Sequence, residues 1–385
     1  MKIIYLANAR IPTEKAHGLQ IMKMCEAFKN QGVDVELVVA NRKDNQLEHI
    51  KPFQYYGIKN EFEIKKLWLL DIVAMGRSFK GLSVPIQNTS FALSALRYLA
   101  NKKPDIIYSR DEFSSFFLSL FKKNIVFELH TFPQSKFTLY KMLFKRCKRI
   151  VVITKSLKKL LVDQLEIDDS KIMVAPDGVS IYQFDIDKSK KECRQYLEKY
   201  YDYFSQEKNI ILYTGHLFRW KGVFTLAESA KYLSNKELIV FVGGMEHDRA
   251  RLNNYIDKNG LSNVKSIRHQ SPTMIPIFLR AADVVVLPNS KEKQISVKYT
   301  SPMKLFEYMA AKKPVVASDL QSIREILDTD NSVLVKSDDP KALSDGIKKL
   351  LNDKNLVNSI VSHAYLDVKE YTWQKRAKNI LIFIK

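Results

Sequence analysis

The sequence predicts an α/β protein built from two Rossmann-like domains in series. Short apolar runs typical of buried parallel strands alternate with segments of helical spacing in both halves of the chain. This alternation lapses over the polar and charged residues 180–208 and restarts at residue 209. The length of 385 residues suits two domains of ordinary size, and a hydrophobic content of 46% is enough for two cores.

The first half opens with a strand–helix–strand pattern. Residues 2–7 predict a strand, residues 8–18 a loop, residues 19–30 a helix and residues 33–39 a second strand. Further strands are expected at 104–109, 125–129, 150–153 and 171–175, and further helices at 91–101, 111–120, 137–147 and 157–165. Between residues 59 and 82, cations and large apolar side chains are interleaved, which suits an amphipathic helix and loop or a membrane interface.

The second half repeats the alternation. Strands are expected at 209–214, 237–242, 264–267, 284–288 and 314–317, and helices at 223–233, 246–259, 274–282 and 342–351. We therefore predict an N-terminal domain over residues 1–185 and a C-terminal domain over residues 186–370. Residues 371–385 are expected to form a helix that packs back toward the first domain.

The stretch 299–325 carries the strongest local signal for a binding site. Ser301, before Pro302, predicts a capped helix start, and the following residues leave little polar face. Lys304 and Glu307 are exceptions that share one face. A helix start suits phosphate, and a carboxylate two turns in suits a diol. This pattern predicts a nucleotide site, and its alternative is a helix with one solvated glutamate before a strand.

Three loops at strand ends add candidate ligand contacts. In residues 215–222, glycines allow close backbone approach, and Arg219 and Lys221 can neutralise a diphosphate. This loop is not a Walker A sequence, so hydrolysis of the P-loop type is not expected. His130 follows a strand, at the edge where parallel sheets bind ligands. His17 precedes a turn glycine, and spacing alone also allows a loop residue without a role.

The net charge of +20 predicts attraction to an anionic surface, although an excess of lysine can also follow from genome composition. Lysines occur in most predicted helices rather than in a stripe with exposed aromatics, so a nucleic-acid partner is not expected. The three cysteines are scattered, and no apolar window is long enough for a membrane span. We therefore expect a cytoplasmic protein. Its positive charge also allows peripheral binding at the inner face of the membrane. Two Asp-x-Asp triplets, 185–187 and 328–330, are expected to be solvated rather than to bind metal.

The motifs together resemble the family 4 glycosyltransferases of the GT-B fold over nearly the whole chain. They are His17-Gly18, the sequence ELH ending at His130, VITKS at 152–156, PDGV at 176–179, the glycines and lysine of 215–222, and KLFEYMAAKKPVVASD at 304–319. The resemblance implies two Rossmann-like domains facing each other across a cleft, with residues 1–185 as the acceptor side and residues 186–370 as the donor side. It also implies retaining transfer from a nucleotide-diphosphate sugar to a lipid-linked or polysaccharide acceptor, with no metal or other cofactor.

The resemblance assigns roles to particular residues. His130 would contact the donor sugar, and Lys221 would hold the diphosphate with Arg219, which substitutes for the family arginine replaced by His216. These three, His130, Lys221 and Arg219, are the expected catalytic residues. Glu307 would bind the ribose. The other expected donor-binding residues, from the two glycine loops and the helix start, are His17, Gly18, Gly215, His216, Tyr299, Ser301, Met303, Lys304 and Leu305.

Tyr299 departs from the family pattern, which has a glutamate at this position that contacts the donor sugar. The departure leaves donor choice open and keeps two alternatives. One is a non-catalytic, glycosyltransferase-like partner subunit with an altered donor pocket. The other is an enzyme similar to nucleotide-sugar 2-epimerases, which would need added acid and base carboxylates beside the sugar.

Overall fold

The computed structural model describes residues 1–42, 47, 49–71, 83–133, 135 and 137–385. The chain forms two compact units, Met1–Pro176 together with Trp373–Lys385, and Asp177–Thr372. The expected boundary at 185 therefore falls inside the second unit. Val179 forms a bridge with Thr372, and its N–H donates to the Tyr371 carbonyl over 2.9 Å. This pairing of residues far apart in sequence draws residues 177–185 into the second unit.

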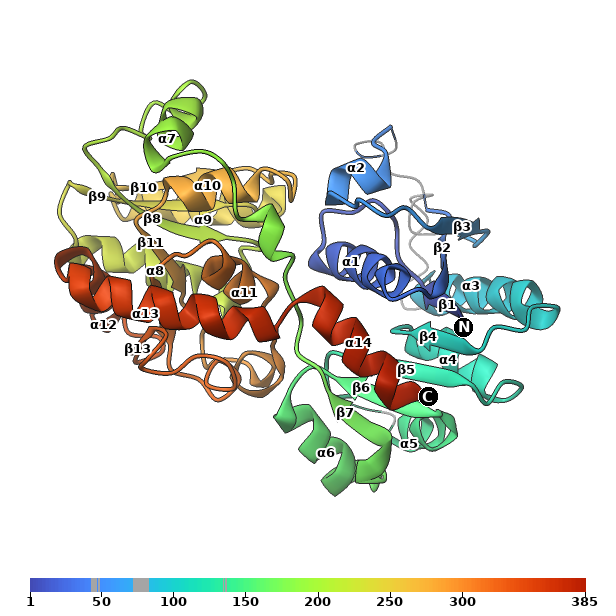
Figure 1. Cartoon of the computed structure of the whole chain (residues 1–385). Coiled ribbons are helices and arrows are strands. Elements are labelled where there is room, and N and C mark those ends of the chain that lie inside the picture. The colour runs from blue at the N-terminus through green and yellow to red at the C-terminus, as the bar shows by residue number, and fades with distance from the viewer. Residues whose placement is uncertain (43–46, 48, 72–82, 134, 136) are drawn as a thin grey trace. The chain divides into compact units, whose positions relative to one another are not determined.

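The first unit is built on a parallel seven-stranded sheet in the order β3-β2-β1-β4-β5-β6-β7 (Figure 1). Its strands are β1 Lys2–Ala7, β2 Asp34–Ala40, β3 Glu63–Leu67, β4 Ile106–Ser109, β5 Ile125–Leu129, β6 Arg149–Val152 and β7 Ile172–Val174. Its helices are α1 Ala16–Asn30, α2 Pro52–Tyr56, α3 Ser83–Ala100, α4 Glu112–Ser119, α5 Phe137–Arg146, α6 Lys155–Leu165 and α14 Trp373–Ile384. The strand order reverses between β1 and β4, and α14 packs against α1.

Two parts of the first unit differ from the prediction. The helix α1 begins at Ala16, so His17 and Gly18 lie in its first turn and not in a loop. A Cβ on Gly18 would lie 2.4 Å from the Tyr56 hydroxyl, so close packing against α2 explains this glycine. Residues 63–67, for which we expected a helix or loop, form the edge strand β3 beside β2. Residues 72–82 of the same interleaved segment lie outside the described residues.

The second unit repeats the architecture with a parallel six-stranded sheet in the order β10-β9-β8-β11-β12-β13. Its strands are β8 Asn209–Thr214, β9 Glu237–Val242, β10 Val264–Ile267, β11 Val284–Leu287, β12 Val315–Ser318 and β13 Val333–Val335. Its α-helices are α7 Lys190–Glu198, α8 Val223–Ser229, α9 Glu246–Lys258, α10 Ile275–Ala281, α11 Met303–Ala310, α12 Pro340–Asn352 and α13 Lys354–Asp367. The strand order reverses between β8 and β11, which marks the crevice where ligands of such sheets bind.

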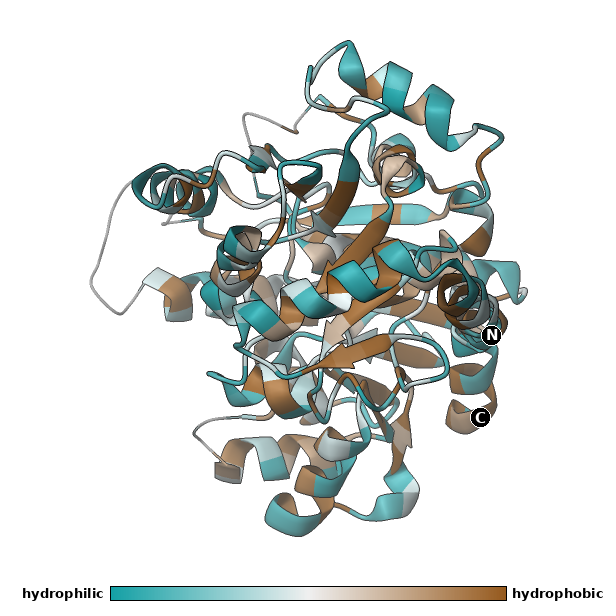
Figure 2. Cartoon of the chain, turned by 90° about the vertical axis from the view of Figure 1, so that its left-hand side faces the viewer, coloured by the Kyte–Doolittle hydropathy of each residue, from teal (hydrophilic) through white to brown (hydrophobic). Residues whose placement is uncertain are grey.

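The cores follow the hydropathy of the strands. Figure 2 shows the strands mainly in brown, while many helices are partly teal. Each unit has apolar side chains with no exposed surface on its central strands, such as Tyr5 on β1 and Leu212 on β8. Among the described helices, none has the length and apolar character needed to cross a bilayer. The two sheets thus provide rigid frames whose strand ends present the candidate site residues.

Candidate functional site

The loop after β8 is fixed against the end of β11. Gly215 and Gly222 have φ values of +113° and +72°, which favour glycine, and residues Arg219–Lys221 form a 3₁₀ turn between them. A Cβ on Gly222 would lie 1.7 Å from the Pro288 carbonyl oxygen. The Ser290 N–H donates to the Trp220 carbonyl over 3.0 Å. The two loops at the strand-order reversal therefore pack directly on each other.

Replacing Gly222 with alanine is expected to lower the free energy of unfolding by about 2–5 kcal/mol, from the positive φ and from overpacking. Gly260→Ala is the matched control, because Gly260 also has a positive φ of +60° but has open space around its Cβ position. Urea denaturation of both variants measures the difference. Equal losses in the two variants would contradict the close packing of Gly222 on Pro288.

The helix α11 starts without a side-chain cap. Its N-cap residue is Pro302, and the expected capping role of Ser301 is wrong. The Ser301 hydroxyl instead accepts a hydrogen bond of 3.0 Å from the N–H of Asp177. The first-turn N–H groups, which include those of Met303 and Lys304, are therefore not covered by a cap. Leu305 donates its N–H to the Pro302 carbonyl over 2.8 Å, and its expected donor-binding role stays a prediction.

Lys304 is a buried lysine at this helix start. Its relative exposure is 9%, and its ammonium has no hydrogen-bond partner in the part of the chain that the structure describes. The Nζ atom lies 3.4 Å from the centroid of the Tyr213 ring. Burial, together with the charge of Lys221, holds the pKa of Lys304 well below its usual range. An anionic ligand beside this side chain would favour its charged ammonium form and supply the missing partner.

Lys221 and Glu307 complete an electrostatic group with Lys304. Burial lowers the pKa of Lys221 to about 8, and its Nζ lies 4.1 Å from the Trp220 ring centroid. Burial raises the pKa of Glu307 to about 7, an effect that Lys304 opposes. Two desolvated cations and one carboxylate thus share a site at an uncapped helix start. This arrangement suits a diphosphate joined to a diol.

The structure does not bring Arg219 into this group. Its side chain is 76% exposed, and its Nε lies 3.4 Å from Glu292 Oε2. The His216 ring stacks on Phe218, with centroids 4.9 Å apart and an interplanar angle of 7°. Tyr299 ends a π-helical turn, Ile295–Tyr299, where burial raises the pKa of its hydroxyl. Contact of Arg219, His216 or Tyr299 with a donor stays a prediction.

His130 belongs to a separate cluster in the first unit. Its Nε2 lies 2.6 Å from Oε1 of Glu128, a fully buried residue on β5. The same oxygen accepts hydrogen bonds from Gln20 over 2.7 Å and from Arg376 over 2.9 Å. The Tyr108 hydroxyl donates to the other carboxylate oxygen. Glu128 therefore fixes the orientation of His130, and Arg376 of α14 fixes Glu128.

Burial alone would raise the pKa of Glu128. Arg376, His130 and Arg110 instead hold it well below its usual range, so the group is a carboxylate. Our sequence reasoning missed Glu128, Gln20 and Arg376. A glutamate inside the apolar run IVFEL was the available signal, since a buried carboxylate needs a cationic partner. Nothing in the sequence indicates that the partner comes from residue 376.

The fold and the site together define a protein of two Rossmann-like units with a candidate nucleotide site in the second. Solved structures share this fold: sucrose-phosphate synthase of Thermosynechococcus elongatus has a TM-score of 0.80 at 16% identity, covering 99% of this chain and 98% of that one. The Anabaena protein HepE, solved with UDP and glucose, has a TM-score of 0.77 at 15% identity, covering 99% and 98%. The architecture is therefore GT-B.

Two family models match the chain, Glycosyltransferase Family 4 over residues 18–182 and Glycosyl transferases group 1 over residues 202–367. The chain belongs to the family 4 glycosyltransferases. An uncharacterized glycosyltransferase of Methanocaldococcus jannaschii is 25% identical over 250 residues, which are 63% of this chain and 59% of that protein. An N,N'-diacetylbacillosaminyl-diphospho-undecaprenol alpha-1,3-N-acetylgalactosaminyltransferase of Campylobacter jejuni is 24% identical over 91% of this chain and 90% of its own. The match thus spans about three fifths of the first relative and most of the second.

Proposed function

We propose that this protein is a retaining glycosyltransferase that uses a nucleotide-diphosphate sugar. The observation that carries the proposal is the buried Lys304 ammonium, which has no hydrogen-bond partner among the described residues and lies at an uncapped helix start. Together with Lys221 it would hold the diphosphate, and Glu307 would accept hydrogen bonds from the two ribose hydroxyls. The fold similarity to a protein solved with UDP-glucose supports this donor class.

In the proposed reaction the bond between the anomeric carbon and the diphosphate oxygen breaks, and a bond to the acceptor oxygen forms on the same face. The acceptor proton passes to the departing phosphate. Lys221 and Lys304 stabilise the negative charge that develops on the leaving group, which is the electrostatic contribution expected of a preorganised site. His130, oriented by Glu128, is proposed to contact the donor sugar. The proposal involves no metal or other cofactor.

The acceptor is proposed to be a lipid-linked or polysaccharide glycan. Two similar proteins support this class of acceptor. One is a capsular polysaccharide biosynthesis glycosyltransferase of Staphylococcus aureus, and the other is the diphospho-undecaprenol N-acetylgalactosaminyltransferase of Campylobacter jejuni. A lipid-linked acceptor would also fit the net charge of +20, because it resides at an anionic membrane surface. The rival proposal, motivated by Tyr299, is a partner subunit that binds nucleotide without turnover.

The test is the melting temperature of the protein with UDP-, GDP-, ADP- and dTDP-sugars. A ligand that binds only the folded state raises the melting temperature by an amount that increases with its affinity and with the logarithm of its concentration. We expect a rise with one nucleotide that Lys221→Ala and Glu307→Ala both reduce. No rise with any donor in a folded sample would overturn the donor site. A rise with neither transfer to undecaprenol-linked acceptors nor hydrolysis of the donor would favour the partner subunit.

The affinity for an intact nucleotide sugar is expected to be highest between pH 7 and pH 8. Above about 8 the Lys221 ammonium deprotonates, and below about 7 the Glu307 carboxylate protonates, so affinity falls on both sides. Isothermal titration calorimetry from pH 6 to pH 9 measures the profile. Lys221→Met should remove the alkaline limb and Glu307→Gln the acid limb. A profile that stays flat in the unmodified protein would contradict these assignments.

A further inference from the structure

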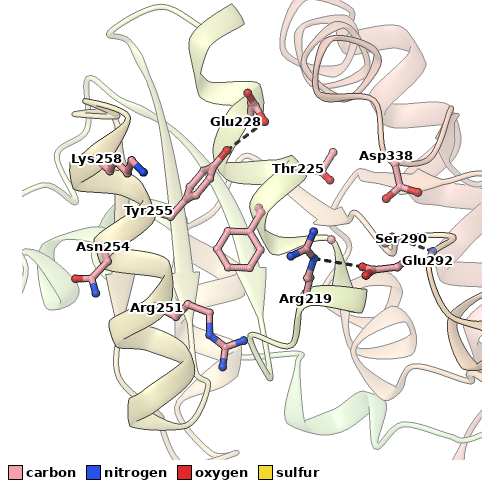
Figure 3. Close-up of a pocket in the computed structure, with 12 residues that line it drawn as sticks. Arg219, Thr225, Glu228, Arg251, Asn254, Tyr255, Lys258, Ser290, Glu292 and Asp338 are labelled. Carbon is pink, nitrogen blue, oxygen red and sulfur yellow. Dashed lines mark hydrogen bonds and ion pairs between the residues drawn. The ribbon is translucent and has the colours of Figure 1, made fainter.

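A second concave site in the second unit lies between the helices α8 and α9. The cavity has a volume of about 590 Å³, within the range of small-molecule sites. Figure 3 shows labelled side chains from α9 opposite others from α8 and from the loops after β11 and β13. Its lining residues are Arg219, Gly222, Phe224, Thr225, Glu228, Arg251, Asn254, Tyr255, Lys258, Ser290, Glu292 and Asp338.

Helical spacing brings these side chains to the cavity. On α9, Asn254, Tyr255 and Lys258 follow Arg251 by three, four and seven residues, so the four side chains share one face of the helix. On α8, Phe224 and Glu228 are four residues apart, and both contact Tyr255 of α9. Polar side chains on both helices, such as Glu228 on α8 and Asn254 on α9, line the cavity and can form hydrogen bonds. The cavity is therefore a groove between two helix faces that neither helix fills.

The charges of this groove balance. Arg219, Arg251 and Lys258 are matched by Glu228, Glu292 and Asp338, so the groove does not select for an anion. The balanced charge of the groove distinguishes it from the group formed by Lys221, Lys304 and Glu307, in which the basic side chains outnumber the acidic one. A second nucleotide or phosphate would not be favoured here.

The polar side chains of the groove are held in place. The Tyr255 hydroxyl donates to Glu228 over 3.2 Å, and Arg219 pairs with Glu292 at 3.4 Å. The N–H of Lys291 donates to Asp338 over 3.0 Å. Fixed carboxylates, guanidinium groups and an amide offer both acceptors and donors. Sugar hydroxyls, which donate and accept at once, can use both kinds of partner.

The same groove has an aromatic wall. The rings of Phe224 and Tyr255 meet edge to face, with centroids 5.1 Å apart and an interplanar angle of 70°. Both pack against a hydrophobic core cluster of the unit and are partly buried. A rigid aromatic surface beside oriented polar groups suits a ligand with apolar ring faces and a polar rim.

We propose that this groove binds a neutral oligosaccharide, a segment of the acceptor or product glycan away from its reacting end. The identification of the ligand as an acceptor or product glycan rests on the proposed function, but the groove is formed by different residues from the donor site. The loop 215–222 joins the two sites: Lys221 belongs to the donor group, while Arg219 and Gly222 line the groove. The exposed Arg219, expected to hold the diphosphate, is thereby given a glycan-contacting role.

The experiment is binding of the labelled full-length protein to an array of neutral, acidic and amino-sugar oligosaccharides, without nucleotide. We expect signals on neutral glycans that fall at least tenfold in the double variant Arg251→Ala, Asn254→Ala. Both side chains are exposed on α9, and because Arg251 also pairs with Asp248 at 3.2 Å, circular dichroism of the double variant checks that the fold is retained. Asp257→Asn, an exposed change on α9 outside the groove, is the matched control and should keep the signal. Tyr255→Phe should weaken binding by releasing Glu228 while keeping the aromatic wall.

The outcomes separate this proposal from the donor site. Absence of any neutral signal, preference for acidic glycans, or binding that survives the double variant would overturn the groove. Lys304→Met, which alters only the donor group, should leave glycan binding unchanged. A protein that binds neutral glycans through the groove but no nucleotide would overturn the donor proposal and support the groove.

Discussion

Replacing Arg376 with methionine is expected to lower the free energy of unfolding of the first unit by about 3–5 kcal/mol, the usual effect of removing one partner of a buried ion pair. Arg376 is 5% exposed, and its guanidinium contacts Glu128 at 2.9 Å and the carbonyls of Ala175 and Pro176. Methionine keeps much of the apolar volume but leaves the Glu128 carboxylate buried without its cation. Urea denaturation monitored by circular dichroism measures the loss.

The pH dependence of this loss identifies its cause. In the unmodified protein the pKa of Glu128 is lowered below its ordinary value of 4.5, so its contribution is present above that pH and is lost as the pH falls further. In Arg376→Met the carboxyl can bind a proton, so the difference between the two proteins should be largest near pH 7 and narrow toward pH 4. Lys378→Met, an exposed change on the same helix, is the control. A loss of under about 1 kcal/mol would contradict a buried Glu128–Arg376 pair.

Lys304→Met is expected to have opposite effects on stability and on binding. The melting temperature of the free protein should rise, because a buried polar group without a partner costs about 1–3 kcal/mol and methionine removes that penalty. The affinity for the nucleotide sugar should fall about 10- to 150-fold, the range for losing a hydrogen bond to a charged group. Thermal unfolding with and without nucleotide measures both effects in one series.

The control for Lys304→Met is Lys293→Met, which makes the same chemical change at an exposed position near the site. It should alter neither the melting temperature of the free protein nor the nucleotide-induced rise. A Lys304→Met protein that is less stable than the unmodified one would mean that Lys304 has a structural partner. Retained affinity in that variant would remove Lys304 from the donor site.

The fold was largely predictable because parallel strands buried on both faces are continuous apolar runs. Runs such as 237–242 and 284–287 stand out from their helices in the sequence, and the structure has strands there. The edge strand β3 was missed because EIKKL has three charged residues among its five and is buried at only one position. The start of α1 was placed late because Gly18 suggested a turn, whereas close packing against Tyr56 requires that glycine.

The candidate site was predictable from the sequence only where its residues are close together in the chain. Lys304 and Glu307 share a helix face by spacing, and the structure couples them electrostatically. The role of Ser301 could not be read locally, because its hydrogen-bond partner Asp177 is 124 residues away. The side of the loop that Arg219 faces was likewise decided by Glu292, which follows a different strand. Contacts between distant segments are set by packing, which a periodicity argument does not contain.

The position of α14 has a consequence for the order in which the chain folds during synthesis. The second unit is one continuous segment, Asp177–Thr372, whereas the first unit needs Trp373–Lys385. A ribosome therefore releases all of the second unit before the residues that complete the first have emerged. Before α14 has emerged, Glu128 has no hydrogen bond from Arg376, and the face of α1 that packs against α14 is exposed to solvent. The unit made first in sequence is thus the last to be completed, and the nascent chain must wait for its final helix before His130 is held in place.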